Sequence, residues 1–309
     1  MDITHCGICG SDIHTLDCGW VPIEYDVVVG HEITGVAIRV GKNVKHIKVG
    51  DRIGVGAQCG ACLECYHCRN GDENICLNGV IGTYIGRWPN VEKTFGGYAD
   101  KWRGHQRFVF KIPDNMSNEV AATFLCAGIT TYAPVKRYNV KPGDKVGVIG
   151  IGGLGHFAVM WAKAMGATVV ALSSTDRKRE DAKALGCDDY VVIGDEEAMK
   201  KHAISFTHII CTSFSKDFNW DAYFSMMLHN STFILAGLPE EPLKVGSIIG
   251  SPKMIEEMLQ FASETSVRPW LNKFPMKECP QAVQHMREGK ARYRIILETR
   301  TSSLPPNGP

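Results

Sequence analysis

The chain has 309 residues, with 34 basic and 33 acidic side chains and a formal net charge of +1. Such a balance produces no field that would draw the protein to nucleic acid or to an anionic membrane surface. The length allows two domains with cores of their own.

The first residues, MDITHCGICGSDIH, have neither the basic nor the apolar segment of a signal peptide. No apolar run reaches the roughly 18 residues that a membrane-spanning helix needs. We therefore expect a cytoplasmic protein that binds no membrane and no nucleic acid, in a compartment where thiols stay reduced. Twelve cysteines in such a compartment favour metal binding or catalysis over disulfides.

Residues of the types that bind metals occur first in three separate segments. They are Cys6, Cys9, Asp12 and His14 in CGICGSDIH, His31 and Glu32 in VVVGHEITG, and Cys126 in AATFLCAGITTY. None of them has the close spacing of a metal motif, so the local sequence is a weak signal. Such residues are more often part of a core, and they form a site only where the fold brings them together.

Four cysteines lie on one short loop, with the spacing Cys62-x2-Cys65-x2-Cys68-x7-Cys76. Four thiolates on such a loop are typical of a closed tetrahedral zinc site, which has a structural role. The turn-forming residues RNGDEN before the last cysteine let the chain fold back. Cys59 also fits the spacing, so a shifted register stays open. A set of buried free thiols is the alternative to a metal site.

The segment KVGVIGIGGLGHFAVMWAKAMGATVVALSS predicts a strand, a glycine turn, a helix and a second strand. The elements are expected over Lys145–Ile149, Leu154–Met165 and Thr168–Ser173. The glycines of the turn are Gly150, Gly152 and Gly155. In a dinucleotide-binding fold the first makes the turn, the second admits the pyrophosphate, and the third lets helix and strand pack closely. A glycine-rich turn in another α/β sheet is the alternative.

The residues after the second strand decide which nucleotide binds. A site for NAD usually places an acid there, roughly 20 residues beyond the glycine turn. This chain instead has hydroxyls and cations, namely Ser173, Ser174, Thr175, Arg177, Lys178 and Arg179. Because they suit a 2′-phosphate, we predict NADP(H). Asp176 is the only acid close by, and it equally suits the cap of the next helix. Alternatively, the basic residues lie on the solvent-exposed face of a helix and bind no phosphate.

Further along the chain, short apolar strands are expected in DDYVVI, THIICTS and STFILAGL. SPKMIEEMLQFASE predicts a helix, with Ser251 as its N-cap and Pro252 at its first position. The tail TSSLPPNGP is expected to be disordered.

Six segments resemble the zinc-dependent medium-chain alcohol dehydrogenases, in family order and over nearly the whole chain. They are CGICGSDIH, GHEITG, CLECYHCRNGDENIC, FLCAGITTY, GIGGLGH and GKARYRIILE. Within the family, the chain looks most like the cinnamyl alcohol dehydrogenase branch and its fungal NADP-dependent members. The resemblance implies interconversion of primary alcohols and aldehydes (cinnamyl, aromatic or medium-chain aliphatic) by hydride transfer with NADP(H).

The resemblance also implies an α/β fold with two domains. Residues 127–250 would form the NADP-binding domain, a Rossmann-type doubly wound parallel sheet. Residues 1–126 would form a mostly β, GroES-like catalytic domain that is shortened at its N-terminus, and the chain would return to it in residues 251–309.

Individual residues take roles from the same resemblance. A catalytic zinc is implied at Cys9, His31 and Cys126, with Glu32 as a resting-state ligand, and a structural zinc at Cys62, Cys65, Cys68 and Cys76. Ser11 and then His14 would relay the substrate proton, with Asp12 beside His31. The cofactor would contact Thr130, Gly150, Gly152, Gly153, Leu154, Gly155, Ser173, Ser174, Thr175, Lys178, Gly237 and, near the pyrophosphate, Arg294.

Two departures from the family bear on activity and assembly. Relatives run through several strands before the first matching segment, and they carry extra residues in the region of Pro242–Ser251, where they form a strand used in dimerisation. We therefore expect a homodimer with a weakened interface. The alternative to an active enzyme is a truncated, catalytically impaired relative that binds zinc and perhaps nucleotide. A zinc-ribbon module for nucleic acid is disfavoured, because acidic side chains offset the basic ones around the cysteines.

Overall fold

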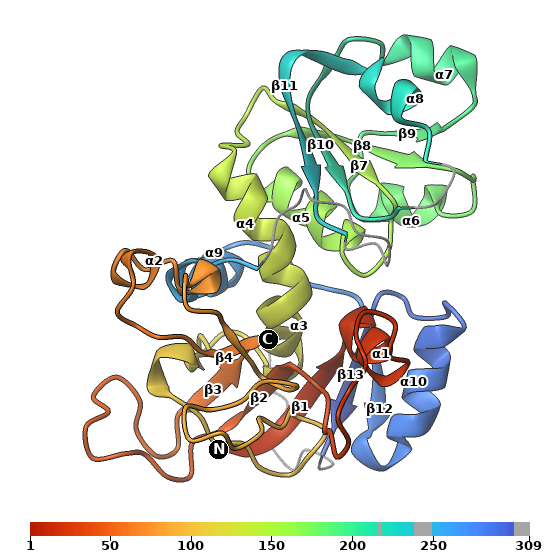
Figure 1. Ribbon diagram of the computed structural model, residues 1–309. Helices are drawn as coiled ribbons and strands as arrows, with labels where there is room; N and C mark the ends of the chain where they lie inside the picture. The colour runs from red at the N-terminus through yellow and green to blue at the C-terminus, as the bar shows by residue number, and fades with distance from the viewer. Residues whose placement is uncertain (215–217, 238–248, 300–309) are drawn as a thin grey trace. The chain divides into compact units, whose positions relative to one another are not determined.

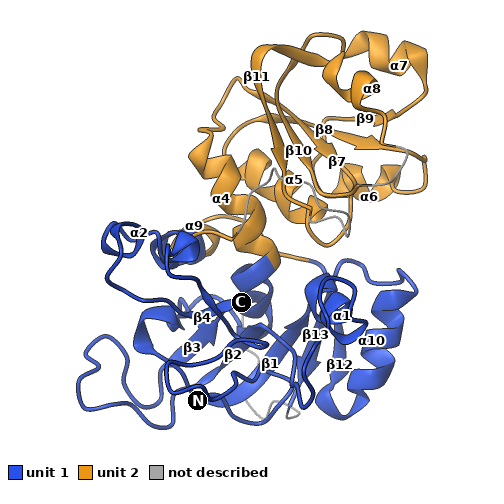
Figure 2. Cartoon of the chain, in the orientation of Figure 1, with its two compact units in different colours: residues 1–126, 251–259, 270–309 blue, residues 127–250, 260–269 orange. Residues whose placement is uncertain are grey.

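The computed structural model describes residues 1–214, 218–237 and 249–299. The chain divides into two compact units, each with a sheet and a core of its own (Figures 1 and 2). Unit 1 comprises Met1–Cys126, Ser251–Leu259 and the residues from Trp270 onward. Unit 2 comprises Ala127–Gly250 and Gln260–Pro269.

A six-stranded sheet, in the order β12-β13-β1-β2-β3-β6, forms the centre of unit 1. Its strands are β1 (Asp2–Ile8), β2 (Glu32–Val36), β3 (Arg52–Val55), β6 (Phe110–Lys111), β12 (Leu271–Pro275) and β13 (Arg294–Glu298). Neighbouring strands are antiparallel, except that β12 runs parallel to β13. Branched side chains such as Ile3, Ile33 and Ile53 fill the core against this sheet.

The remaining elements of unit 1 are short; some pack on this sheet, and two strands form a separate two-stranded sheet. They are α1 (Gly10–Leu16), α2 (Tyr66–Arg69), α3 (Asn118–Thr123), α10 (Cys279–Arg287), the 3₁₀ turns η1 (Glu73–Ile75), η2 (Gln106–Phe108) and η4 (Met276–Glu278), and the paired strands β4 (Gln58–Gly60) and β5 (Ile81–Gly82). Helix α3 packs on β1, β2, β3 and β13, and α10 packs on β1, β12 and β13. The predicted mostly β domain is therefore confirmed.

Unit 2 is built on a parallel sheet in the order β11-β10-β7-β8-β9. Its strands are β7 (Lys145–Ile149), β8 (Thr168–Ser173), β9 (Asp189–Val192), β10 (Phe206–Cys211) and β11 (Met227–Leu235). Counted from β7, this is the order 3-2-1-4-5 of dinucleotide-binding folds, whose ligand crevice lies at the carboxyl ends of the two central strands. The Rossmann-type sheet is confirmed, and the first two strands have the predicted bounds.

One helix of unit 2 precedes β7, and the others connect successive strands of the sheet. They are α4 (Ile129–Arg137), α5 (Gly155–Ala164), α6 (Arg179–Ala184), α7 (Glu196–Lys201) and α8 (Trp220–Phe224). Helix α5 is one residue shorter at each end than the helix predicted over residues 154–165. The core of the unit includes Leu172, Phe206 and Ile209, which are fully buried.

The predicted helix in SPKMIEEMLQFASE is α9 (Pro252–Glu264). As expected for an N-cap, the Ser251 hydroxyl accepts the N–H of Met254 at 3.4 Å. Residues 260–269 pack with unit 2, whereas the family resemblance predicted that every residue after 251 belongs to the catalytic domain. The Phe261 ring explains this, because its centroid lies 6.0 Å from that of Tyr132 and 6.1 Å from that of Trp161 in unit 2.

Two predictions fall on parts of the chain outside the described residues. These are the disordered tail and most of the shortened segment Pro242–Ser251, on which the expectation of a weakened dimer depends. Among the residues that are described, no helix combines the length and the apolar character needed to cross a bilayer.

Candidate active site and metal centres

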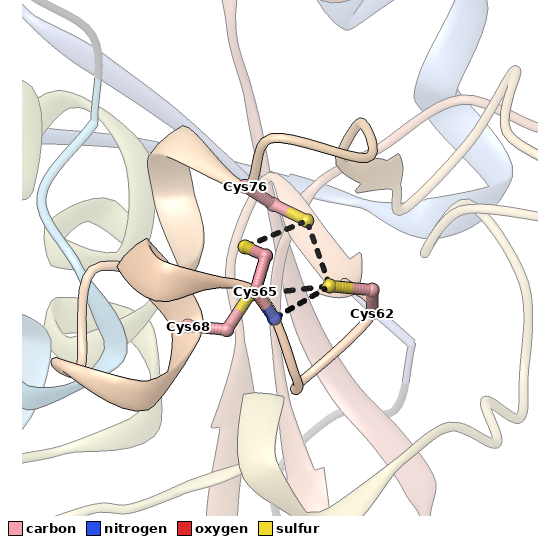
Figure 3. Close-up of side chains that lie close together, drawn as sticks. All are labelled: Cys62, Cys65, Cys68 and Cys76. Carbon is pink, nitrogen blue, oxygen red and sulfur yellow. Dashed lines mark hydrogen bonds between the residues drawn. The ribbon is translucent and has the colours of Figure 1, made fainter.

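Four cysteine sulfurs meet in one lobe of unit 1 (Figure 3). The Sγ–Sγ distance is 3.9 Å for Cys62 and Cys68, 3.9 Å for Cys65 and Cys76, and 3.5 Å for Cys62 and Cys76. Zinc bonded tetrahedrally to sulfur at about 2.3 Å requires sulfurs about 3.8 Å apart. The lobe therefore fits a zinc ion enclosed by four thiolates, which is the donor set of a structural site.

Backbone N–H groups favour the ionised form of two of these thiols. The N–H of Cys65 donates to Cys62 Sγ at 3.3 Å, and the N–H of Leu77 donates to Cys65 Sγ at 3.4 Å. Backbone donors, that of Cys68 first, lower the pKa of Cys65 to about 6. Cys59 lies on β4 and instead donates its thiol to the Gly82 carbonyl at 3.3 Å. The geometry thus favours the register that leaves Cys59 out.

A second group of possible ligands forms where three segments of unit 1 meet. Because β1 and β2 are antiparallel, Cys9, directly after β1, lies beside His31 and Glu32 at the beginning of β2. Cys126 comes from the π-helical turn η3 (Phe124–Gly128), which follows α3. Cys9 Sγ lies 3.8 Å from Cys126 Sγ, and His31 Nε2 lies 3.1 Å from Cys126 Sγ. The fold thus brings together residues with no local motif.

The donor set of this group matches a catalytic zinc site. Two thiols and one imidazole are the ligands of one class of catalytic zinc, which keeps its fourth position for an exchangeable ligand. One ligand atom from each of Cys9, His31, Glu32 and Cys126 lies within 4.8 Å of the others. The hydrogen bond between the two thiols lowers the pKa of Cys9 and raises that of Cys126. The residues present therefore fit zinc.

Asp12 fixes the ring of His31. The His31 Nδ1 atom lies 3.1 Å from Asp12 Oδ1, so this nitrogen carries the proton and Nε2 keeps its lone pair for a metal. Burial alone would lower the pKa of His31, but the Asp12 carboxylate with its hydrogen bond, together with Cys9, raises it, so the net shift is upward. The imidazole is thereby a more basic ligand than a histidine without such a partner.

Glu32 is fully buried and forms an ion pair with Arg294, the first residue of β13. Burial raises the pKa of Glu32 to about 7, although the Arg294 guanidinium acts in the opposite direction. Glu32 Oε2 has no hydrogen-bond partner in the described part of the chain, which leaves it able to accept a cation. Its cross-strand partner Gly7 makes room for this side chain, since a Cβ there would lie 1.9 Å from Oε2.

Arg294 was expected near the pyrophosphate because of the family resemblance. In the structure its guanidinium contacts Glu32 and donates to the Ile8 carbonyl at 3.2 Å, and the side chain is buried. A contact with the cofactor therefore stays a prediction for this residue.

The expected proton relay begins on α1. Ser11 Oγ lies 3.6 Å from Cys9 Sγ, so the hydroxyl borders the metal centre. His14 lies three residues further along α1, which puts it on the same side of the helix as Ser11. Its ring stacks on Trp20, with 4.8 Å between ring centroids. The two side chains therefore lie on one side of α1, and their roles in a proton relay stay predictions.

The glycine turn after β7 has the geometry of a phosphate-binding loop. Gly150 has a φ of +81°, which favours glycine, and a Cβ on Gly155 would lie 1.8 Å from the Gly150 carbonyl oxygen. A Cβ on Gly152 would meet nothing within 4 Å, so this position faces open space. The Thr212 hydroxyl donates to the Gly150 carbonyl at 2.8 Å and ties the ends of β7 and β10 together. Gly153 and Leu154 complete the turn before α5.

The side chains after β8 are arranged around that turn. The Lys178 ammonium donates to the Ile151 carbonyl, so this cation lies beside the glycine turn. Asp176 pairs with Arg179 at 2.6 Å and does not cap α6, because the residue before the helix is Lys178. The Arg179 guanidinium also lies 4.7 Å from the centre of the Tyr190 ring. A structural role therefore suits Arg179, while Lys178 remains the cation best placed for a 2′-phosphate.

The other expected cofactor residues lie in the same unit. Ser173 ends β8, and its hydroxyl accepts the N–H of Thr175 at 3.4 Å, across the intervening Ser174. Thr130 is the second residue of α4. Gly237 donates its N–H to the Cys211 carbonyl at 3.2 Å, next to the end of β10.

A third cluster has ligand-type residues but a different character. His5 Nε2 lies 3.9 Å from Glu119 and 3.8 Å from Glu298. Lys273 Nζ lies 2.6 Å from Glu119 and 3.8 Å from Glu298, so both carboxylates already pair with an ammonium. Burial lowers the pKa of His5 to about 4, which keeps its ring neutral. We therefore assign these residues to an ion-pair network.

Two tyrosines contact the metal centre and were missed from the sequence. Tyr84 OH lies 3.0 Å from His31 Nδ1, and Tyr98 OH lies 3.1 Å from Asp12 Oδ2. These pairs are 53 and 86 residues apart in the chain, and both tyrosines lie in irregular segments. No periodicity or local motif could have pointed to them.

Comparisons with known proteins cover both units. Residues 1–114 match the family model of the alcohol dehydrogenase GroES-like domain, and residues 153–268 match that of the zinc-binding dehydrogenases. The NADP-dependent alcohol dehydrogenase C 1 of Mycolicibacterium smegmatis is 40% identical over an alignment 313 residues long, which covers 97% of this chain and 89% of that protein.

Solved structures agree with the family models. A cinnamyl alcohol dehydrogenase of Sorghum bicolor has a TM-score of 0.91 and 33% identity, covering 98% of this chain and 90% of its own. The CAD of Helicobacter pylori complexed with NADP(H) has a TM-score of 0.89 and 32% identity, covering 97% and 90%. The placement among fungal members stays a prediction.

Proposed function

Since the chain belongs to the zinc-binding alcohol dehydrogenase family, in its cinnamyl alcohol dehydrogenase-like branch, we propose that it interconverts primary alcohols and aldehydes with NADP(H). The proposed substrates are cinnamyl, other aromatic or medium-chain aliphatic alcohols and aldehydes. The observation that carries this proposal is the meeting of Cys9, His31 and Cys126 beside the Ser11 hydroxyl.

The proposed catalytic metal would be held by Cys9, His31 and Cys126, with Glu32 able to join them. Zinc at such a site supplies a Lewis acid that makes an alcohol hydroxyl easier to ionise and an aldehyde carbonyl easier to reduce. Asp12 orients the imidazole, and Arg294 pairs with the Glu32 carboxylate beside the thiols. The second zinc would stay enclosed by the four cysteines of the separate lobe.

The proposed proton path uses α1. The Ser11 hydroxyl would accept the proton from the substrate hydroxyl, and His14 would receive it and pass it towards solvent. General acid–base transfer of this kind needs groups within hydrogen-bond reach in the substrate complex, which one helix can supply from positions three apart.

The proposed cofactor is NADP(H), which exchanges the hydride with the substrate carbon. The glycine turn and the N-terminus of α5 would face the pyrophosphate. Ser173, Ser174 and Lys178 would hold the 2′-phosphate, since one cation and two hydroxyls follow β8 while Asp176 is engaged by Arg179. The NADP-dependent relative from M. smegmatis supports the same choice.

The proposed setting is the cytoplasm, with a small alcohol or aldehyde as the partner molecule and a homodimer as the assembly. All twelve cysteines are free thiols, which agrees with a reducing compartment. Sedimentation of the pure protein over a range of concentrations measures the proposed weakness of the dimer. A tight dimer at the lowest concentration would contradict it.

A continuous assay of NADPH absorbance tests the proposed activity. Zinc-loaded protein is mixed with cinnamaldehyde or with a medium-chain aldehyde, and we expect NADPH to be consumed in proportion to enzyme. A protein that holds two zinc ions and binds NADPH, yet turns over none of these substrates, would favour the catalytically impaired relative instead.

A further inference from the structure

The carboxylate of Asp12 joins two of the proposed zinc ligands. Its Oδ2 accepts the backbone N–H of Cys9 at 2.8 Å, and its Oδ1 lies 3.1 Å from His31 Nδ1. Oδ1 also accepts the N–H of Gly30 at 3.1 Å. Asp12 is fully buried, so these bonds are not shared with bulk water. Any rotation of this carboxylate would therefore disturb both the Cys9 backbone and the His31 ring.

Two tyrosine hydroxyls complete the surroundings of the carboxylate. Tyr98 OH donates to Asp12 Oδ2 at 3.1 Å. Tyr84 OH lies 3.0 Å from His31 Nδ1, the same atom that lies 3.1 Å from Asp12 Oδ1. A carboxylate offers about four lone-pair positions, and the four donors from Cys9, Gly30, His31 and Tyr98 fill them. A carboxylate so saturated keeps a single orientation.

The backbone holds each tyrosine in place. Thr83, which precedes Tyr84, donates its N–H to the Ala57 carbonyl at 3.0 Å and its hydroxyl to the Gly56 carbonyl at 2.5 Å. Tyr98 donates its own N–H to the Val29 carbonyl at 3.1 Å, just before His31. The two hydroxyls therefore reach the Asp12–His31 pair, Tyr98 at Asp12 and Tyr84 at His31, from segments anchored independently of α1, which carries Asp12.

We infer that Tyr84 and Tyr98 are positioning residues of the catalytic metal centre. Their hydroxyls lock Asp12 in the orientation that aims His31 Nε2 at the metal, and in this way they set the metal affinity of that centre. The inference rests on the proposed zinc site at Cys9, His31 and Cys126. Groups that orient a metal-binding histidine typically change metal affinity or activity about 10–100-fold when they are removed.

The test uses Tyr84→Phe and Tyr98→Phe, each of which removes one hydroxyl and keeps the ring. Tyr190→Phe is the matched control, because Tyr190 is 6% exposed and its hydroxyl donates to the Thr175 carbonyl at 2.6 Å in unit 2. Zinc affinity is measured by competition with a chelator. The visible spectrum of cobalt-substituted protein reports ligand geometry, with Cys9→Ser identifying the bands of the catalytic site.

We expect each of the two variants to bind the catalytic ion about tenfold or more weakly and to shift its cobalt bands. The ion at Cys62, Cys65, Cys68 and Cys76 should be retained as in the unchanged protein. Tyr190→Phe should alter neither site, although its melting temperature falls. A purely structural role would instead lower the melting temperatures alone.

Unchanged zinc affinity and cobalt spectra in the folded variants would overturn the inference while leaving the proposed function intact. If one variant does not fold, the other decides the question, because the two hydroxyls are removed separately. A starting protein that holds only one ion per chain would overturn the proposed catalytic site, and the inference with it.

Discussion

Replacing Arg294 by methionine should strongly destabilise unit 1. The Glu32 and Arg294 side chains are 0% and 3% exposed, and each is the charged partner of the other. Without the guanidinium, the carboxylate keeps its burial and loses its countercharge. Breaking a buried pair in this way costs about 3–5 kcal/mol, because the remaining charge is uncompensated.

A double-mutant cycle measures the interaction free energy between Glu32 and Arg294 separately from the contribution of either side chain alone. Glu32→Gln should cost a similar amount as Arg294→Met, since it leaves the guanidinium buried without a carboxylate. The double variant should cost much less than the sum, because replacing a whole buried pair is often close to neutral. We expect a coupling free energy of about 3 kcal/mol.

The loss of folding stability caused by Arg294→Met should also depend on pH. Burial raises the pKa of Glu32 to about 7, above its value in an unfolded chain, so the folded state loses stability as the pH rises from about 4.5 to 7. Removal of Arg294 takes away the charge that opposes this shift. The destabilisation by Arg294→Met should therefore be smaller at about pH 6 than at about pH 8, where the carboxyl must ionise.

Urea unfolding of zinc-loaded protein, followed by tryptophan fluorescence, gives these free energies. Lys273→Met is the control, because its ion pair with Glu119 is partly exposed and should be worth less than about 1 kcal/mol. The reasoning would be refuted if Arg294→Met cost no more than Lys273→Met, or if the double variant cost the full sum of the singles.

Three further predictions concern metal, cofactor and pH. Cys9→Ser should lose one zinc ion per chain and the activity, whereas Cys65→Ser should unfold the cysteine lobe; metal analysis and melting curves distinguish them. Lys178→Ala should weaken NADPH binding by about 1.5–3 kcal/mol and leave NADH binding unchanged, and equal affinity of the starting protein for both nucleotides would contradict the NADP assignment. Burial acts to raise the pKa of Asp189, but the hydrogen bond from Lys201 and other donors lowers it to about 2. Asp189→Asn should therefore cost roughly 1–2 kcal/mol at about pH 7 and much less near pH 2, because this stability is lost as the pH falls from about 4 through about 2. Equal costs at both pH values in urea unfolding would contradict this prediction.

The sequence alone correctly predicted those parts of the structure in which the contacting residues lie close together in the chain. The strand, glycine turn and helix around Gly150 lie where the pattern predicts them, because alternation, turn residues and helical periodicity act over a few residues. The four-cysteine loop is equally local, and its sulfurs meet as its spacing predicts. Neither the glycine turn nor the four-cysteine loop required knowledge of which strands pair in a sheet.

The proposed catalytic zinc ligands could not be predicted from local sequence patterns. His31 and Cys126 are 95 residues apart. The pairing of β1 with β2 puts Cys9 beside His31, and the packing of α3 on β2 brings the following turn, with Cys126, to both. Family resemblance pointed to these ligands, and no physical signal in the sequence did. Tyr84 and Tyr98 lie outside the six segments that carry the resemblance, so only the folded structure reveals their contacts.

The most direct test of the account is a zinc titration of metal-stripped protein while NADPH oxidation by cinnamaldehyde is followed. The account predicts that the first equivalent fills the four-cysteine lobe without restoring turnover, and that activity rises with the second equivalent. In Cys9→Ser the second equivalent should bind weakly and restore nothing. Full activity with one zinc per chain or none, or no activity with both sites filled, would contradict a zinc-dependent alcohol dehydrogenase.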